Sequence, residues 1–186
     1  MEFHSPGPII FQLGFLTVRW YGLMIATGFM LALSAALKMA KARGLDQERF
    51  VNLALSCFIF GVIGARLYYV VLNPSHFLIH PAEILATWNG GLSIHGGIIG
   101  GALAGVIYLR LAKLPILSYL DIMATCTPLG QAVGRWGNFF NSEAFGLPVQ
   151  DNFPLKLFIP PDSRPISFHA NNFFHPTFLY HSIWNL

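Results

Sequence analysis

The sequence predicts an all-α integral membrane protein: a polytopic helix bundle with four complete spans, the start of a fifth, and an irregular extracytoplasmic head segment. Of the 186 residues, 54% are hydrophobic and 10% are charged, whereas an ordinary soluble domain carries about 25% charged residues. The mean hydropathy is +0.56. The apolar residues gather in runs of about 20, the length of helix that crosses a hydrocarbon core about 30 Å thick.

The spans are assigned from these apolar runs within a single membrane domain, residues 1–186. The four complete spans are residues 18–37, 50–72, 92–111 and 117–139, and a fifth begins near Thr177. No basic segment or small-residue cleavage pattern precedes the first run, so we expect it to be kept rather than removed as a signal peptide. Residues 141–176 are rich in proline and lack helical periodicity, which predicts the head segment. This segment either guides a substrate peptide or covers the helix ends.

Positive charge is distributed unevenly over the loops. The segment after the first span carries four basic residues, the turn after the third carries Arg110 and Lys113, and the loop 73–91 has neither lysine nor arginine. Cytoplasmic loops of membrane proteins are enriched in basic residues. We therefore expect the first loop and the Arg110 turn to be cytoplasmic, and the N-terminus, the loop 73–91 and the head segment to be extracytoplasmic.

Each of the four spans carries a polar residue near its predicted outer end that could face a common pocket. These residues are Tyr21, Arg66, His95 and Arg135. Two interpretations remain open, because tyrosine and arginine also anchor helix ends at membrane interfaces, whereas an ionisable side chain within a membrane is by default a candidate for ligand binding. The second interpretation predicts an outer pocket.

The charge of this pocket predicts an anionic ligand. Asp121 lies at the opposite, inner end of the fourth span, so Glu143 is the nearby carboxylate, and we expect it to pair with Arg66 or Arg135. A positive charge remains in either case. Guanidinium groups bind phosphate through planar, charge-assisted hydrogen bonds. The phosphate most available at that depth belongs to an anionic lipid headgroup.

Glycines recur through the third span, which reads GGLSIHGGIIGG at 90–101. Gly97, Gly101 and Gly105 are four residues apart and share one face, so we expect another helix to approach closely there. His95 lies among these glycines. It either hydrogen-bonds across the helix interface or acts as a neutral imidazole that accepts a proton.

Several other kinds of site are disfavoured. Cys57 and Cys126 lie in apolar runs without CxxC spacing, which favours buried thiols over a disulfide or a metal site. The seven histidines are dispersed, so we expect no metal and no cofactor. Lysine and arginine are scattered rather than clustered, which argues against nucleic-acid binding.

Five motifs follow one another along the whole chain: WYG at 20–22, GARLYY at 64–69, GLSIHGG at 91–97, GRWGNFFNSE at 134–143 and HPTFLY at 175–180. Together they resemble the bacterial prolipoprotein diacylglyceryl transferase family. The resemblance implies a multi-pass enzyme of the inner membrane that transfers the diacylglyceryl group of phosphatidylglycerol to the lipobox cysteine of a prolipoprotein. It implies a thioether-linked lipid and glycerol phosphate as products, and phosphatidylglycerol, the lipobox peptide and the membrane as partners.

The resemblance also implies roles for particular residues. His95 corresponds to the family's essential histidine, and Arg135 to the arginine that holds the headgroup, in agreement with the phosphate expected from charge. We therefore predict three catalytic residues, His95, Arg135 and Tyr21. The predicted substrate-binding residues are Arg135, Arg66, Asn138, Glu143 and Gly146.

The chain departs from the family in two respects. His181 follows the last motif where family members usually have glutamate, and we expect the change to alter packing or pairing at the start of the fifth span. The resemblance also implies further spans, one of them bearing an arginine, whereas this sequence ends at Leu186. We therefore expect a C-terminally truncated chain, and we do not expect it to be active alone.

Two alternatives to a transferase remain open. A transporter or channel subunit predicts ionisable residues at several depths, including the midplane, whereas here they are predicted at one outer level. A non-catalytic fragment that binds anionic lipid would use Arg66 and Arg135 but gives no reason for His95.

Overall fold

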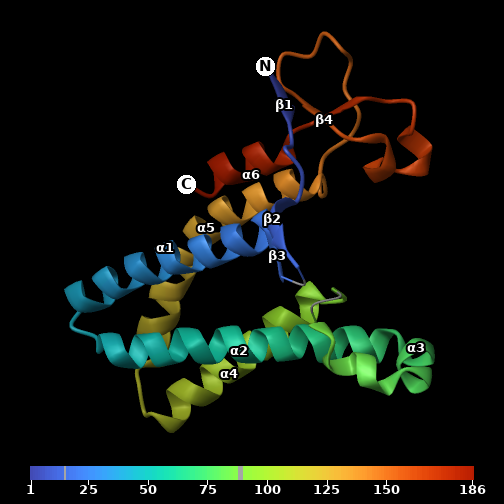
Figure 1. The fold of residues 1–186 in the computed structure, drawn as a ribbon. Coiled ribbons are helices and arrows are strands. Elements are labelled where there is room, and N and C mark those ends of the chain that lie inside the picture. The colour runs from blue at the N-terminus through green and yellow to red at the C-terminus, as the bar shows by residue number, and fades with distance from the viewer. Residues whose placement is uncertain (15, 88–89) are drawn as a thin grey trace. The chain divides into compact units, whose positions relative to one another are not determined.

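The structure, a computed structural model, describes residues 1–14, 16–87 and 90–186 (Figure 1). These residues form two compact units: unit 1 comprises Met1–Ala36 and Ala124–Leu186, and unit 2 comprises Leu37–Met123. The helices are α1 (Trp20–Ala42), α2 (Gln47–Leu72), α3 (Pro74–Ile79), α4 (Ile94–Leu111), α5 (Ile116–Asn141) and α6 (Thr177–Trp184). Helices α1 and α5 contribute residues to both units, and each unit is described by itself.

The four predicted complete spans each lie largely within a long helix. Among the described residues, three helices are long and apolar enough to cross a membrane, namely α1, α2 and α4. Helix α5 has 26 residues, but its second half carries Gln131, Arg135 and Asn138. These polar residues make it less apolar than the other three, and its crossing of a membrane stays a prediction. Helix α6 begins at Thr177, the residue near which the fifth span was predicted to begin.

Two residues determine the turn between α1 and α2. Gly44 has a left-handed backbone conformation, with a φ of +70°. Asp46 caps α2, because its Oδ1 accepts hydrogen bonds from the backbone N–H groups of Glu48 and Arg49 at 2.8 and 3.2 Å. A glycine after one helix and an aspartate before the next are common stop and start signals. The turn is therefore encoded locally.

Unit 2 is held together by the close approach of α2 and α4. A side chain at Gly96 would place its Cβ 2.3 Å from the carbonyl oxygen of Gly64, and one at Gly100 would place it 2.4 Å from that of Phe60. The two backbones are therefore in direct contact. The prediction that the glycines of the third span admit another helix is confirmed, and α2 is that helix.

Unit 1 brings α5 against α1 and α6. A Cβ on Gly28 of α1 would lie 2.7 Å from the carbonyl oxygen of Gly130, so these helices also meet at glycine. Helix α6 is joined to α5 through Ser182, whose hydroxyl donates to the carbonyl of Ala132 at 2.8 Å and accepts from the indole N–H of Trp136 at 3.3 Å. These contacts hold the second half of α5 in place.

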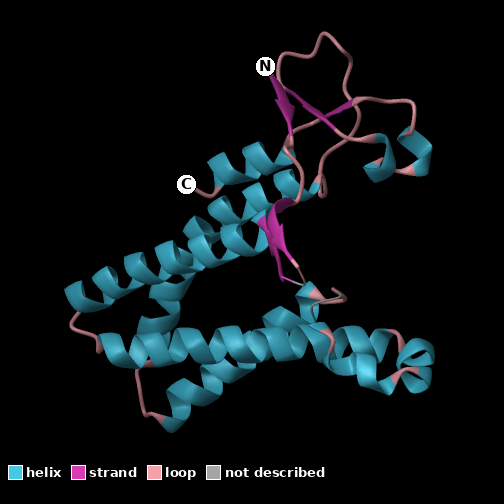
Figure 2. Cartoon of the chain, viewed as in Figure 1, coloured by secondary structure: helices cyan, strands magenta, loops and turns pink. Residues whose placement is uncertain are grey.

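The prediction of an all-α chain is wrong in unit 1, where the described residues include five short strands in two sheets (Figure 2). The strands are β1 (Glu2–His4), β2 (Ile9–Leu13), β3 (Leu16–Arg19), β4 (Lys156–Phe158) and β5 (Phe173–Phe174). Strands β2 and β3 form an antiparallel hairpin, while β4 pairs parallel with β1 and antiparallel with β5. Strands this short give no period that can be recognised in the sequence.

The head segment is consequently more regular than predicted, and it packs on the end of α5. It contains β4, β5 and the short 3-10 turns η3 (Pro161–Ser163) and η4 (Ile166–Phe168). One buried apolar cluster joins it to α5 and α6, and the cluster consists of Phe139, Leu157, Ile159, Phe174 and Phe178. Burial of these side chains stabilises the segment against the helix end where the predicted site residues lie.

Candidate functional site

Three polar residues of unit 1 follow one another along the last two turns of α5. Arg135, Asn138 and Asn141 are three residues apart, the spacing of neighbours on a helix surface. The side-chain amide of Asn138 donates to Oε1 of Glu143 at 3.0 Å, and that of Asn141 donates to the same oxygen at 3.4 Å. Nη1 of Arg135 donates to the Asn138 amide oxygen at 3.4 Å. The arginine and the carboxylate are therefore linked through Asn138.

The backbone around Glu143 is unusual. Ser142 and Ala144 both have left-handed conformations, with φ values of 52° and 50°, which residues other than glycine seldom adopt. The backbone N–H of Glu143 donates to the carbonyl of Asn138 at 3.0 Å, and Thr177 Oγ1 donates to the carbonyl of Ala144. Strained conformations of this kind cluster at functional sites. Here they turn the Glu143 side chain back toward α5.

Tyr21 of α1 lies against the same part of α5. A Cβ on Gly137 would be 2.8 Å from the Tyr21 ring, so the ring lies directly on the glycine backbone. The preceding residue, Trp20, stacks on Phe140 with ring centroids 4.6 Å apart. Tyr21 is within electrostatic range of both Arg135 and Glu143. Unit 1 thus brings together four of the predicted residues, Tyr21, Arg135, Asn138 and Glu143.

Gly146 has a packing role in the structure. Its N–H donates to the carbonyl of His175 at 3.0 Å, and a Cβ there would lie 2.8 Å from Cβ of His175 and 3.1 Å from Thr177. A larger residue would therefore separate this turn from the start of α6. Substrate binding by Gly146 stays a prediction.

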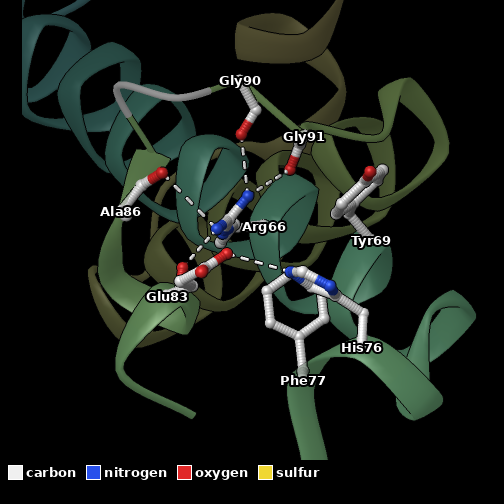
Figure 3. Close-up of a pocket in the computed structure, with 8 residues that line it drawn as sticks. All are labelled: Arg66, Tyr69, His76, Phe77, Glu83, Ala86, Gly90 and Gly91. Carbon is white, nitrogen blue, oxygen red and sulfur yellow. Dashed lines mark hydrogen bonds and ion pairs between the residues drawn. The ribbon is translucent and has the colours of Figure 1, made fainter. Parts of the chain in front are cut away.

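Arg66 of unit 2 is buried among backbone oxygens (Figure 3). Its side chain donates five hydrogen bonds, all to backbone carbonyls. Nε donates to Ile84 at 2.9 Å, and Nη1 donates to Gly90 and Gly91 at 2.7 and 2.9 Å. Nη2 donates to Glu83 and Ala86 at 2.5 and 3.5 Å. The guanidinium carbon also lies 5.8 and 5.2 Å from the ring centres of Tyr69 and Phe77. Substrate binding by Arg66 stays a prediction, and these contacts favour a different role.

His95, also in unit 2, lies in the first turn of α4. It is exposed, and its ring centre is 6.3 Å from that of Tyr68. The residue that precedes α4 by one position, Ser93, is tied to α2 by a hydrogen bond from its N–H to the carbonyl of Ala65 at 3.0 Å. An exposed imidazole on an anchored helix start is accessible to a substrate, and its role as a base stays a prediction.

The remaining charges fit the sequence analysis in part. Asp121 forms an ion pair with Arg43 within unit 2. The described ion pairs do not include Glu143, whose carboxylate is held by amides instead of by the arginine of its own unit. The described residues contain no group of three or more histidine, cysteine, aspartate or glutamate side chains able to hold a metal ion.

Two residues of this site were not predicted from the sequence. Asn141 supplies the second amide to Glu143, and its position three residues after Asn138 was the available signal. Gly137 forms the surface on which Tyr21 lies. Nothing in the sequence separates Gly137 from the other glycines of α5, because the close contact comes from another helix.

The arrangement in unit 1 is suited to an anionic ligand. A guanidinium has five N–H donors, and within the described part of the chain Arg135 has one hydrogen bond, the 3.4 Å contact to Asn138. Arg135 is partly buried, so a ligand there would be partly shielded from water, and a phosphate matches the planar fork of donors. Fold and site together describe a mostly helical chain with three helices apolar enough to cross a membrane. Near the end of its α5, Arg135 has one hydrogen bond within the described residues and is linked through Asn138 to the amide-held carboxylate of Glu143.

A family model described as prolipoprotein diacylglyceryl transferase matches residues 8–186. The chain belongs to this family, as the five motifs indicated.

Curated relatives agree over the full length of the chain. Proteins named phosphatidylglycerol–prolipoprotein diacylglyceryl transferase from Synechococcus elongatus, Parasynechococcus marenigrum and a Synechocystis species are 46%, 48% and 43% identical to it over 186, 184 and 185 residues. The alignments cover 100%, 99% and 100% of this chain and 64%, 66% and 65% of the respective relatives. The chain thus spans slightly less than two thirds of the length of these relatives.

Proposed function

We propose that this chain transfers the diacylglyceryl group of phosphatidylglycerol to the lipobox cysteine of prolipoproteins, the first step of lipoprotein maturation. This proposal replaces the expectation that the chain is inactive alone, and the test below decides between the two. The observation that carries the proposal is the group at the end of α5, where Arg135 is linked to Glu143 through Asn138 and the Tyr21 ring packs on Gly137. The name shared by the relatives supports the reaction.

The proposal includes a location and an orientation. The protein is proposed to lie in the bacterial inner membrane, with α1, α2, α4 and α5 as four complete spans and α6 as the start of a fifth. The N-terminus and the head segment, residues 141–176, are proposed to be extracytoplasmic. The apolar character of α1, α2 and α4 supports membrane insertion, and the basic residues that follow α1 support the orientation.

Arg135 is proposed to hold the phosphate of the lipid. Its guanidinium can donate to two phosphate oxygens at once, and its charge stabilises the negative charge that develops on the departing glycerol phosphate. Glu143 lies beside it with Oε1 held by two amides. A carboxylate in this position is suited to accept hydrogen bonds from the glycerol hydroxyls of the headgroup, which would favour phosphatidylglycerol over lipids that lack them.

The acceptor thiol requires a base, because a free cysteine with a pKa of about 8.5 is mostly protonated at neutral pH. His95 is proposed to take this proton. The thiolate then attacks the glyceryl carbon that bears the phosphate ester. The S–C bond forms as the C–O bond breaks, and glycerol phosphate leaves with the bonding electron pair.

The test uses membranes that contain the 186-residue chain, phosphatidylglycerol labelled in its acyl chains, and a lipobox peptide. Mass spectrometry of the peptide should detect a thioether adduct at its cysteine. Arg135→Ala and His95→Gln should each lower the yield at least about 100-fold, as expected for the loss of charge stabilisation or of a base. Arg110→Gln, an exposed position in the last turn of α4, is the control and should keep full yield.

Two further outcomes limit the proposal. Equal transfer from phosphatidic acid would remove the role of the glycerol hydroxyls at Glu143. Binding of phosphatidylglycerol without any adduct would contradict transferase activity for this chain and would leave a lipid-binding protein.

A further inference from the structure

The contacts of Arg66 leave no donor for a ligand. A guanidinium has five N–H groups, and the five hydrogen bonds of Arg66 all end on backbone carbonyls between Glu83 and Gly91. The side chain is only 7% exposed. A lipid phosphate could bind Arg66 only by displacing several of these carbonyls, each of which would then need another partner.

The five carbonyls that accept from Arg66 form what we call the Arg66 cradle. Two consecutive glycines shape the part of this cradle that leads into α4. Gly90 and Gly91 have φ values of +87° and +74°, and both carbonyls accept from Nη1 of Arg66. A Cβ on Gly91 would lie 2.7 Å from Nη1 and 2.6 Å from the ring of Tyr69, whereas nothing lies within 4 Å of one on Gly90. The left-handed turn therefore brings two successive carbonyls to one nitrogen, and Gly91 allows the arginine to approach.

The turn continues directly into the helix start that carries His95. The N–H of Ser93 donates to the carbonyl of Ala65, the neighbour of Arg66. A Cβ on Gly96 would lie 2.3 Å from Cβ of Tyr68. His95 thus lies between two points of contact with α2, and both points are within two residues of Arg66.

We propose that Arg66 is a positioning residue. By binding the carbonyls of the Gly90–Gly91 turn and those of the segment from Glu83 to Ala86, it fixes the first turn of α4 and the direction of the His95 imidazole, and it does not bind the substrate phosphate. The catalytic meaning of this inference rests on the role of His95 in the proposed function. The two arginines then have separate tasks, positioning for Arg66 and ligand binding for Arg135.

The test compares Arg66→Lys with Arg135→Lys in the 186-residue chain, placed in lipid nanodiscs that contain phosphatidylglycerol. Lysine keeps the charge but concentrates its donors on one nitrogen, so it cannot replace the five contacts. The readouts are hydrogen exchange of residues 90–97, the ¹⁵N shifts of the His95 ring and the affinity for phosphatidylglycerol by native mass spectrometry. Global unfolding is measured alongside, so that a local effect is separated from a general loss of structure.

We expect Arg66→Lys to accelerate exchange of residues 90–97 at least about tenfold through local opening, to shift the His95 signals, and to leave lipid affinity unchanged. Arg135→Lys should weaken lipid affinity and leave the other two readouts as they are. Arg110→Lys, at the opposite end of α4, is the matched control and should change none of them.

Gly91→Ala serves as a second variant should Arg66→Lys fail to fold. It keeps the guanidinium but disturbs the turn, so it should reproduce the exchange and His95 changes at unchanged lipid affinity. Weaker lipid binding by Arg66→Lys, or unchanged exchange and His95 signals in the folded variants, would overturn the proposal. These readouts do not require transfer, so a missing thioether product contradicts only the proposed function.

Discussion

Units 1 and 2 each contain an arginine that the sequence assigned to a phosphate, and the surroundings of the two differ. Arg66 in unit 2 is 7% exposed and donates five hydrogen bonds to carbonyls. Arg135 in unit 1 is partly buried and, within the described residues, has one hydrogen bond, to Asn138. A cation whose donors are used by the protein is part of the scaffold, whereas one with donors left over can bind a ligand. The partners of a charge, more than its position in a span, identify a site.

The backbone near the two arginines also differs, in the type of residue that adopts the left-handed conformation. Left-handed residues occur in both places, but beside Arg66 they are Gly90 and Gly91, while beside Arg135 they are Ser142 and Ala144. Glycine adopts this conformation at little cost, and other residues do so only when their surroundings impose it. The strain is therefore concentrated around Glu143, which supports a ligand-binding role for unit 1 and a structural role for the Arg66 cradle.

The largest effect that separates the two arginines should be on stability. Arg66→Gln should lower the free energy of unfolding by about 3 kcal/mol, because four partly buried carbonyl contacts and one buried contact are lost, and a fully buried acceptor left without a donor costs about 1–3 kcal/mol by itself. Arg135→Gln should change it by no more than about 0.5 kcal/mol, as at positions without buried partners. Reversible unfolding in mixed micelles, followed by circular dichroism, measures both. Equal losses would show that the contrast between the two surroundings does not exist in the membrane.

This contrast marks the limit of what the sequence could provide. Arg135, Asn138 and Glu143 were assigned to one site from the family resemblance and from the nearness of Glu143 in the GRWGNFFNSE block, and they do lie together, because helical periodicity and the turn that follows are local properties. The partners of Arg66 come from a loop 17 to 25 residues further along the chain. A single sequence does not show which carbonyls a side chain reaches over that separation. An arginine whose donors are used by the protein therefore cannot be distinguished in the sequence from one whose donors can bind a ligand.

The same distinction applies to the fold. Long apolar runs predicted helices within a few residues of the observed bounds of α1, α2, α4 and α5, because span length and hydropathy are local. The pairing of β1 with β4 joins residues more than 150 positions apart. Strands of a few residues are stabilised by packing, here by the buried apolar cluster of unit 1, and not by their own propensity. The sequence predicted that another helix would approach the glycines of the third span, but it did not identify that helix as α2.

An intermediate effect should separate two glycines of α5 that lie one turn apart. A Cβ on Gly137 would be 2.8 Å from the Tyr21 ring, whereas one on Gly134 would make an ordinary contact of 3.5 Å with Ile25. Gly137→Ala should force the ring from its preferred position at a cost of about 1 kcal/mol, and should weaken phosphatidylglycerol binding up to about tenfold. Gly134→Ala should leave it unchanged. Native mass spectrometry gives both affinities, and a loss in Gly134→Ala alone would remove Tyr21 from the binding group.

The smallest effect concerns the exposed edge of the Arg66 cradle and its dependence on pH. Nε2 of His76 lies 2.9 Å from Oε2 of Glu83 (Figure 3), whose backbone carbonyl accepts from Arg66. The hydrogen bond with His76 lowers the pKa of the Glu83 carboxyl below its usual value, with smaller contributions from the charges of His76, His80 and Arg66. A lowered pKa in the folded state means that ionised Glu83 stabilises the fold above the pKa of the unfolded chain, and that this contribution is lost as the pH falls through the folded value.

Protection of the cradle amides from hydrogen exchange, corrected for the intrinsic pH dependence, should therefore decline only at a pH below the usual titration range of a glutamate, where Glu83 becomes protonated. His76→Asn should raise the pKa of Glu83 toward its usual value and move this decline to higher pH. His80→Asn, which removes only a nearby charge, should move it less. Carboxyl ¹³C shifts of Glu83 across the titration measure the pKa directly. An unchanged titration in His76→Asn would show that the pair does not form, and the exposed edge of the cradle would then depend on Arg66 alone.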